Sequence, residues 1–346
     1  MIRIRRLDLM DLCADDLAQV NEVLRRSPRA TAFHTAEWNR LLIEEFGLRH
    51  VALLAADEGM PVGLYIYFRW EGNICKSPAI NLQSVYGGPI AVDDSPDVIR
   101  ELLDESERRE PLGAFEIWTP PCVDPAPFSR QGYIARQMYT PVLDLACSEE
   151  ARWARFHRNK RTTIRKAVKL GAMVSEENDG SLPEYRRMVA ETLGASGIEA
   201  LPLHFYENVM ARLAPSGLAR MFLVRVDQRP VSGTIVLCFN GTVYGWDIGW
   251  HREFYRFSPN DLLVWGVSRI ASREGYRRFD LLRIEPDRLP GIAKWKDSFG
   301  GEIAPCYLLQ KATAGFRLFH PLQVLMTEPS RAMRKAKSLL GMGSAR

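Results

Sequence analysis

The sequence predicts an α/β (α+β) protein of two tandem domains, each with a mixed, mainly antiparallel sheet flanked by helices. Its 346 residues fit two domains of about 150 residues each. Both halves repeat one order of elements: helices, an antiparallel meander, then a helix and a strand. A composition of 46% hydrophobic and 25% charged residues is typical of globular proteins and excludes disordered, collagen-like and coiled-coil chains. We expect domains at 1–147 and 148–315 and a basic helical tail at 316–346.

Apolar periodicity and turn residues define the elements of the N-terminal half. Thr35 is expected to cap the start of the second helix and Gly47 its end, because threonine accepts a backbone N–H and glycine adopts the left-handed conformation. The predicted helices span 15–26, 35–47 and 95–109. The predicted strands span 1–7, 50–56, 62–70, 84–92, 115–119 and 140–145.

The C-terminal half shows the same signals in the same order. Asn240-Gly241 indicates a hairpin turn between two strands. The predicted helices span 148–170, 182–194, 203–213 and 259–274. The predicted strands span 220–227, 231–239, 242–250, 278–282 and 306–310.

Charge is distributed unevenly between the halves. Residues 1–150 contain 15 Lys and Arg and 24 Asp and Glu, a balance of −9, and residues 151–346 contain the remaining 31 and 18, a balance of +13. The basic half can attract an anionic partner such as RNA, a phosphate-bearing cofactor or an anionic lipid headgroup. Attraction between the two domains is the alternative, and the sequence leaves both open.

The basic tail has two possible contacts. Its segment 331–337 is predicted to be helical. Packing back on the N-terminal domain is favoured over peripheral contact with a membrane, because a short basic helix has only marginal membrane affinity.

Cysteine usage and the N-terminus predict a cytoplasmic location. The six cysteines form no CxxC pair, which favours free thiols in a reducing compartment. The first residues, MIRIRRLDLMDLC, are charged and lack the apolar core of a signal peptide. The longest uncharged apolar stretches are too short and polar to cross a bilayer.

Four stretches, taken together, resemble the FemAB-type branch of the GNAT acyltransferase superfamily. They are FHTAEWN at 33–39, FHRNKRTTIRKAVKLG at 156–171, the segment 244–265 with its SPND, and FD at 279–280 followed by WKDSFGG at 295–301. The resemblance implies two tandem GNAT-like domains with a cleft between them. It also implies transfer of an acyl or aminoacyl group to an amine.

The resemblance further implies the reactants. The donor is aminoacyl-tRNA or acyl-CoA, with no tightly bound cofactor. The acceptor is an amine, in the Fem-type enzymes that of a peptidoglycan precursor, which is lipid-linked or nucleotide-linked. The long coiled-coil insertion of some Fem enzymes is absent from this sequence.

Lys296 is the leading catalytic candidate, with Trp295 beside it as a substrate-binding residue. The following Phe-Gly-Gly allows a close approach of backbone to ligand, and an ammonium there can hold a phosphate, a carboxylate or a developing oxyanion. The resembled motif has a lysine at this position. A surface lysine lying over Trp295 is the alternative.

A basic helix supplies two further substrate-binding candidates. Positions 152–169 hold eight basic residues and no acidic one. Helical spacing places Arg161 and Arg165 on one side, where they can grip phosphates, with Ile164 and Val168 on another. A solvated helix face relieved by the acidic half is the alternative.

The strand after Asn240-Gly241 supplies the remaining candidates. Alternation places Tyr244 and Trp246 on one face and Asp247 on the other, and Tyr255 follows. These three aromatic residues are expected to bind substrate. Asp247 is expected to accept a proton from the attacking amine if burial raises its pKa, with a solvent-facing strand residue as the alternative.

The sequence also bears on metals and on the donor. No His, Cys or Asp spacing indicates a metal site. The glycine-rich loop that holds the coenzyme A diphosphate in ordinary GNAT enzymes is missing, which favours the tRNA donor. We therefore expect a FemAB-like aminoacyl transferase. The alternatives are an acyl-CoA-dependent N-acyltransferase of an amino sugar or amino acid in polysaccharide or envelope synthesis, and a non-catalytic RNA-binding module.

Overall fold

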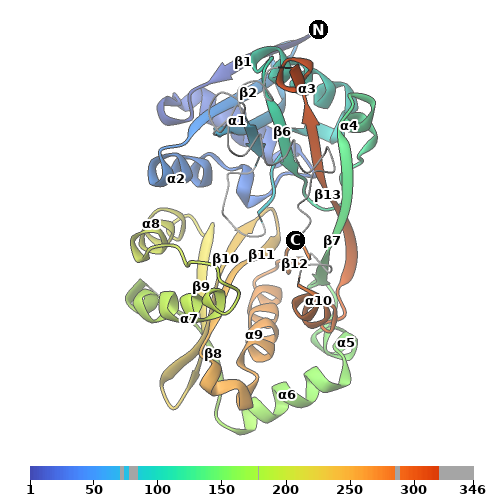
Figure 1. Cartoon of the computed structure of the whole chain (residues 1–346). Coiled ribbons are helices and arrows are strands. Elements are labelled where there is room, and N and C mark those ends of the chain that lie inside the picture. Colours follow the sequence, from blue (N-terminus) through green and yellow to red (C-terminus); the bar gives the residue numbers. More distant parts are fainter. Residues whose placement is uncertain (71–73, 78–84, 178, 285–288, 319–346) are drawn as a thin grey trace, which may run out of the picture.

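The chain folds into an N-terminal and a C-terminal lobe, in which helices flank a mixed sheet (Figure 1). The structure is a computed structural model and describes all residues except 71–73, 78–84, 178, 285–288 and 319–346. Most of the expected tail therefore lies outside the described residues. The predicted fold class, a mixed sheet with flanking helices, is confirmed.

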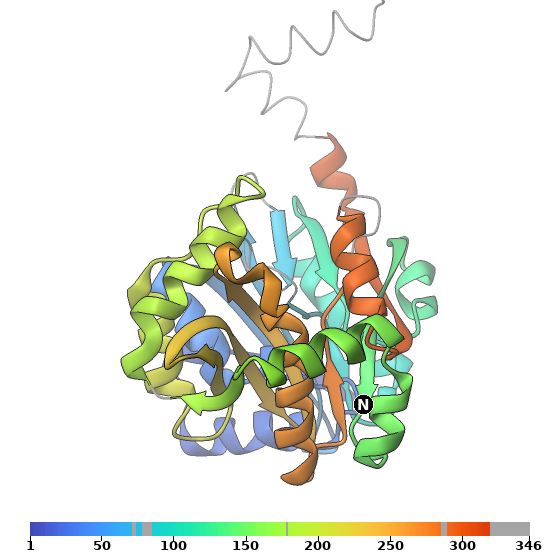
Figure 2. The same cartoon turned by 90° about the horizontal axis from the view of Figure 1, so that it is seen from below.

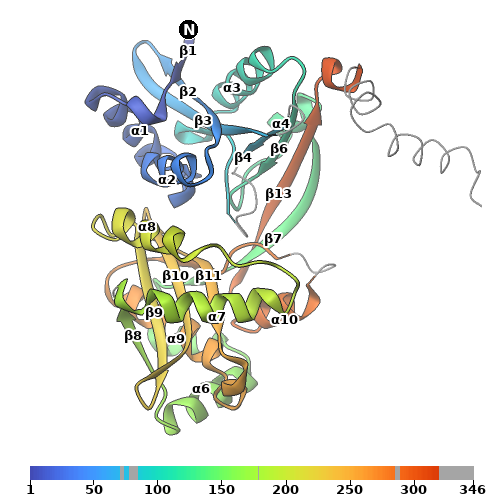
Figure 3. The same cartoon turned by 60° about the vertical axis from the view of Figure 1, so that its left-hand side comes forward.

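The strands belong to three groups. Those of the N-terminal lobe are β1 (Ile2–Leu7), β2 (Arg49–Asp57), β3 (Met60–Trp70), β4 (Ile74–Ser77), β5 (Ile90–Ala91) and β6 (Ala114–Trp118). Those of the C-terminal lobe are β8 (Met173–Glu177), β9 (Ala219–Val226), β10 (Arg229–Phe239), β11 (Thr242–Trp250) and β12 (Arg278–Asp280). Two long strands run between the lobes, β7 (Ile134–Asp144) and β13 (Glu302–Ala312) (Figure 3).

The helices flank both parts of the sheet. Those of the N-terminal lobe are α1 (Ala14–Arg26), α2 (Ala36–Phe46), α3 (Pro96–Arg109) and α4 (Ala126–Arg130). Those of the C-terminal lobe are α5 (Glu149–Arg155), α6 (Arg158–Lys169), α7 (Leu182–Gly194), α8 (Leu203–Leu213), α9 (Pro259–Arg273) and α10 (Pro290–Asp297). Within the described part of the chain, none of the helices has both the length and the apolar character needed to cross a bilayer.

One sheet of thirteen strands passes through both lobes. Its order is β1-β2-β3-β4-β6-β13-β7-β12-β11-β10-β9-β8, with β5 beside β3. Neighbours are antiparallel except for the parallel pairs β4–β6 and β11–β12. β13 pairs with β7 along nine positions and also with β6, so the last strand of the sequence links the two halves of the sheet. The boundary expected at 147/148 falls between β7 and α5 and stays a prediction.

Local signals explain the elements that were predicted well. The Thr35 hydroxyl accepts the Trp38 N–H at 3.3 Å and caps α2, as expected. Gly47 ends that helix with a φ of +59°, in the left-handed region. The strand predicted at 242–250 is β11, with the same bounds.

Two elements that were predicted as continuous are interrupted in the structure. The described part of the strand expected at 84–92 contains only β5, because Gly88 has a φ of +109° and interrupts the extended backbone. The single helix expected at 148–170 is two helices, α5 and α6. Phe156 separates them in an extended conformation, and its side chain is buried in the core of the C-terminal lobe.

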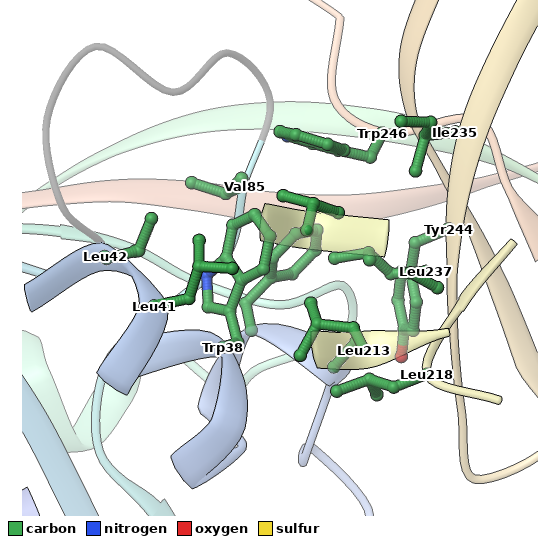
Figure 4. Packing of buried hydrophobic residues seen from close by; sticks show 14 of the residues in the cluster. Trp38, Leu41, Leu42, Val85, Leu213, Leu218, Ile235, Leu237, Tyr244 and Trp246 are labelled. Atoms are coloured by element: carbon green, nitrogen blue, oxygen red, sulfur yellow. The ribbon is translucent and has the colours of Figure 1, made fainter. Parts of the chain in front are cut away.

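An apolar cluster joins the two lobes (Figure 4). Trp38 of α2 and Trp246 of β11 meet edge to face, with ring centroids 5.3 Å apart. Phe33 and Tyr244 form a similar pair at 5.6 Å. Because these aromatic pairs bury large apolar areas, they fix one lobe against the other.

Candidate active site

A cleft of about 1770 Å³ opens between the lobes. Residues of β4, β6, β7 and β13 line one side, and residues of β11, α9, α10 and the α7–α8 connection line the other. Five of the eight predicted site residues line it: Trp246, Asp247, Tyr255, Trp295 and Lys296. The other three, Arg161, Arg165 and Tyr244, are not among the described residues that line this cleft.

Lys296 lies near the end of α10 with a half-buried side chain. Its ammonium donates hydrogen bonds to the backbone carbonyls of Leu282, at 3.0 Å, and Arg283, at 3.3 Å. An ammonium has three N–H donors, so a third is left for a ligand in the cleft. Burial lowers the pKa of Lys296 to about 8, although the nearby Asp280 carboxylate opposes the shift. The side chain is therefore mostly cationic at neutral pH and close to its titration range.

Asp280 fixes the backbone that holds Lys296. Its side chain is buried, and Oδ1 accepts hydrogen bonds from the Leu282 N–H at 2.7 Å, the Tyr86 hydroxyl at 3.3 Å and the Thr140 hydroxyl. Burial raises the pKa of Asp280, and these donors oppose that effect. Because the donors come from both lobes, the carboxylate ties the Lys296-binding turn to the lobe interface.

Asp247 lies on β11 at a β-bulge. The pairing register shifts by one residue between Ile235 and Leu237 of β10, opposite this point. As a result Trp246 and Asp247 both contact Tyr206 of α8. The Asp247 carboxylate accepts a hydrogen bond from the Tyr206 hydroxyl at 2.8 Å. The ring centroids of Trp246 and Tyr206 lie 6.2 Å apart. The simple alternation that placed these two neighbours on opposite faces is wrong, because the bulge changes the side-chain directions.

Burial gives the Asp247 carboxyl a pKa suited to proton transfer. Desolvation raises its pKa to about 6, while the Tyr206 hydroxyl and the Ile248 N–H limit the shift. At neutral pH the carboxylate is therefore mostly ionised and able to accept a proton.

A buried ion network holds Trp295 against α9. Asp261, in the first turn of α9, accepts hydrogen bonds from the Lys160 ammonium, the Trp295 indole N–H and the Thr163 hydroxyl, each at 2.8 Å. Sequence reasoning missed Asp261 and Lys160. No local signal in the sequence links these two residues, which lie on α9 and α6. Since Trp295 precedes Lys296, this network also positions the lysine.

The aromatic candidates occupy different environments. Tyr244 is buried in the apolar cluster that joins the lobes, where its ring packs against Phe33 and Tyr86. Trp246 is buried against Trp38 and also lines the cleft. Tyr255 is 73% exposed at the edge of the cleft.

The two arginine candidates lie on the outer side of α6. Ile164 and Ala167 face the core of the C-terminal lobe, and Arg161 and Arg165 do not share that side. Val168, expected beside Ile164, is 56% exposed, and Ala167 takes the inner position instead. The arginines are therefore placed for a partner on the protein surface.

The N-terminus of α9 faces the cleft but presents few free N–H groups. Pro259, at the first helical position, has no N–H, and the Asp261 N–H is bonded to the Ser258 carbonyl at 3.0 Å. A helix N-terminus ordinarily attracts anions through free N–H groups and the helix dipole. Here the ion pair of the Asp261 carboxylate with the Lys160 ammonium already occupies the first turn, so this helix end offers a phosphate little net positive charge.

Sequence comparison finds a family model that matches much of the C-terminal lobe. Residues 154–297 match the family model described as acetyltransferase (GNAT) domain. A stretch of 99 residues is 28% identical to the lipid II:glycine glycyltransferase of Staphylococcus saprophyticus subsp. saprophyticus. That stretch covers 29% of this chain and 24% of the relative, so the match spans about a quarter of the glycyltransferase.

Similarity over the whole chain is structural. The crystal structure of FemX aligns with a TM-score of 0.69 at 12% identity, covering 91% of this chain and 98% of FemX. A tandem GNAT protein from the clavulanic acid biosynthesis pathway aligns with a TM-score of 0.56 at 13% identity, covering 91% and 99%. At these identities the likeness concerns the fold, and it confirms the expected tandem GNAT architecture. The chain therefore matches the acetyltransferase (GNAT) domain model over residues 154–297 and has the two-lobed fold of FemX.

Proposed function

We propose that this protein is an acyltransferase that moves an aminoacyl group from aminoacyl-tRNA to an amine of a cell-wall precursor. The observation that carries the proposal is one cleft lined by both a lysine cation, Lys296, and a proton-accepting carboxylate, Asp247. The sequence match to a protein named lipid II:glycine glycyltransferase supports the acceptor class.

In this reaction the acceptor amine attacks the ester carbonyl of the aminoacyl-tRNA. A C–N bond forms, and the carbonyl oxygen becomes an oxyanion. This oxyanion accepts a hydrogen bond from the third N–H of the Lys296 ammonium. Asp247 takes the proton released by the nitrogen. The C–O ester bond then breaks, and Asp247 returns its proton to the leaving ribose oxygen. Loss of one oxyanion donor typically lowers kcat by about 10² to 10³.

The α9 N-terminus supports tRNA as the donor. An acyl-CoA would place a diphosphate near a helix N-terminus of this kind. In this chain Pro259 offers no N–H, and the Asp261 N–H is already bonded to the Ser258 carbonyl. An aminoacyl ester brings its carbonyl to Lys296 without requiring that helix.

An acyl-CoA-dependent N-acyltransferase of an amino sugar or amino acid is the second candidate. One observation favours it: the family model that matches residues 154–297 is described as an acetyltransferase domain. This candidate uses the same two residues with a thioester in place of the ester.

The test offers each donor separately to the purified full chain. We expect aminoacyl-tRNA, together with a lipid-linked or nucleotide-linked precursor, to give an amide product, and acetyl-CoA to give none. Lys296→Ala should keep the fold, measured by circular dichroism, and lose about 10² to 10³ in kcat. Lys296→Arg is the matched control that keeps a cation. Transfer from acetyl-CoA alone, or full turnover by Lys296→Ala, contradicts the proposal.

A further inference from the structure

The outer side of α6 carries a set of cations without acidic partners. Positions 152–169 contain eight basic residues and no acidic one. Arg155 pairs with Asp144, and Lys160 pairs with Asp261. Five others form no ion pair with any described residue: Arg158, Arg161, Arg165, Lys166 and Lys169. Like charges on one helix repel each other, so this surface is stabilised by an anionic partner.

Apolar side chains protrude beside these cations at the end of the helix. Val168, Leu170 and Met173 are 56%, 45% and 63% exposed. Three of the fifteen exposed large apolar side chains among the described residues thus fall within six positions. Gly171, with a φ of +83°, turns the chain between α6 and the edge strand β8.

We propose that this surface docks on a bilayer that contains anionic phospholipids. We call it the α6 surface, and it consists of Arg158, Arg161, Arg165, Lys166, Val168, Lys169, Leu170 and Met173. Its cations meet the phosphates of the headgroups, and its aliphatic side chains enter the boundary with the acyl chains. Arginine and lysine alone would equally suit an RNA backbone. Aliphatic side chains add nothing to phosphate contacts, and RNA surfaces use aromatic side chains for stacking, so the combination favours lipid.

The position of α6 brings the cleft close to such a membrane. The helix crosses an outer face of the C-terminal lobe (Figure 2). Lys160 in its first turn lines the cleft, and Lys169 ends the helix. Twelve residues at 1.5 Å rise span about 18 Å. A protein docked in this way keeps its cleft within reach of a lipid-linked headgroup. The docking goes beyond the proposed transfer reaction and does not depend on its donor.

Vesicle flotation of the full chain tests the proposal without any substrate. We expect binding to vesicles of phosphatidylcholine with phosphatidylglycerol, weakening with added salt, and no binding to phosphatidylcholine alone. The variant Arg165→Gln/Lys166→Gln/Lys169→Gln should weaken binding on the order of 100-fold, because each cation near an anionic bilayer contributes about fivefold. The variant Val168→Ser/Leu170→Ser/Met173→Ser should also weaken vesicle binding, while its binding to tRNA stays unchanged.

Two controls assign the effect to the α6 surface. The tail segment 331–337 is also basic and could itself bind anionic vesicles. Only the difference in vesicle binding between the wild type and the α6 variants therefore tests the α6 surface. Ile134→Ser removes another exposed apolar side chain, 77% exposed, and should bind vesicles as the wild type does. All variants should melt at the wild-type temperature. Wild-type vesicle binding by either α6 variant overturns the proposal, and loss of tRNA binding by the cation variant alone makes the surface an RNA site.

Discussion

The cleft contains two titratable side chains whose pKa values are displaced towards each other. Desolvation raises the pKa of Asp247 and lowers that of Lys296, because burial disfavours the charged form of either group. The acid thus titrates below neutral pH and the ammonium above it. Such a pair indicates a division of roles between a proton acceptor and a charge stabiliser.

We expect a bell-shaped dependence of kcat/KM on pH. Activity should rise as pH passes about 6, where Asp247 becomes ionised, and fall as pH passes about 8, where Lys296 loses its proton. Steady-state rates measured across this range check the prediction. Lys296→Arg should remove the alkaline fall, because an arginine stays protonated there. A flat profile in the wild type would exclude these two groups from the rate-determining chemistry.

Tyr206 is expected to act on the reaction through Asp247. Tyr206→Phe removes the hydrogen bond that lowers the pKa of this carboxyl, so the acid limb of the pH profile should move up by about one unit. The alkaline limb, which reports Lys296, should stay in place. Phe46→Leu changes another aromatic residue near α8 and serves as a control, since its ring contacts Phe205 rather than Asp247. A loss of rate that is the same at every pH, with no shift of the acid limb, would mean that Tyr206 has only a structural role.

The sequence alone located only part of this site. Lys296 and Trp295 lie within one short motif, so adjacent residues identified them. Asp261 and Lys160 form their ion pair across 101 positions of the chain, and nothing in local periodicity connects residues that far apart. Long-range pairs of this kind become visible only when α6 and α9 pack together.

At the scale of elements, β11 and its neighbours determine how the cleft is shaped. The strand carries Trp246 and Asp247 at its bulge and packs closely on α7 beyond it. Gly249 permits that approach. The strand bounds were predictable, because alternation and the Asn240-Gly241 turn are local. The bulge was not, since it depends on how β10 and β11 pair.

Gly249→Ala should destabilise the protein strongly. An added Cβ would lie 2.4 Å from the Val189 nitrogen and 2.6 Å from the Met188 carbonyl carbon, which are backbone atoms of α7. We expect a loss of about 3 kcal/mol in the free energy of unfolding. Gly194→Ala on the same helix meets no atom within 4 Å and should stabilise by about 0.5 to 1 kcal/mol. Urea denaturation of both variants checks the contrast, and equal effects would refute the close packing.

At the scale of the whole molecule, the two lobes share one sheet and one apolar cluster. The repeated order of elements predicted two similar lobes correctly. It did not predict their union, because the pairing of β13 with β6 and β7 joins residues from opposite ends of the chain. This union holds the two sides of the cleft in a fixed relation.

Trp38→Ala should weaken both lobes together. The Trp38 side chain is fully buried and contacts Phe33 of its own lobe and Trp246 of the other. We expect a loss of about 3 to 5 kcal/mol and a single, lowered calorimetric transition. Trp70→Ala, at a side chain 37% exposed, should cost about 1 kcal/mol or less. Two separate transitions, with only one displaced, would show that the lobes unfold independently.

The placement of β13 has a consequence for biosynthesis. During translation, β6 and β7 leave the ribosome long before the strand that lies between them, and until then both expose unpaired backbone groups. The N-terminal lobe therefore reaches its final form only after β13, which ends at Ala312, has left the ribosome. Chains released before β13 is made keep unpaired strand edges, which are prone to aggregate and are recognised by chaperones and proteases.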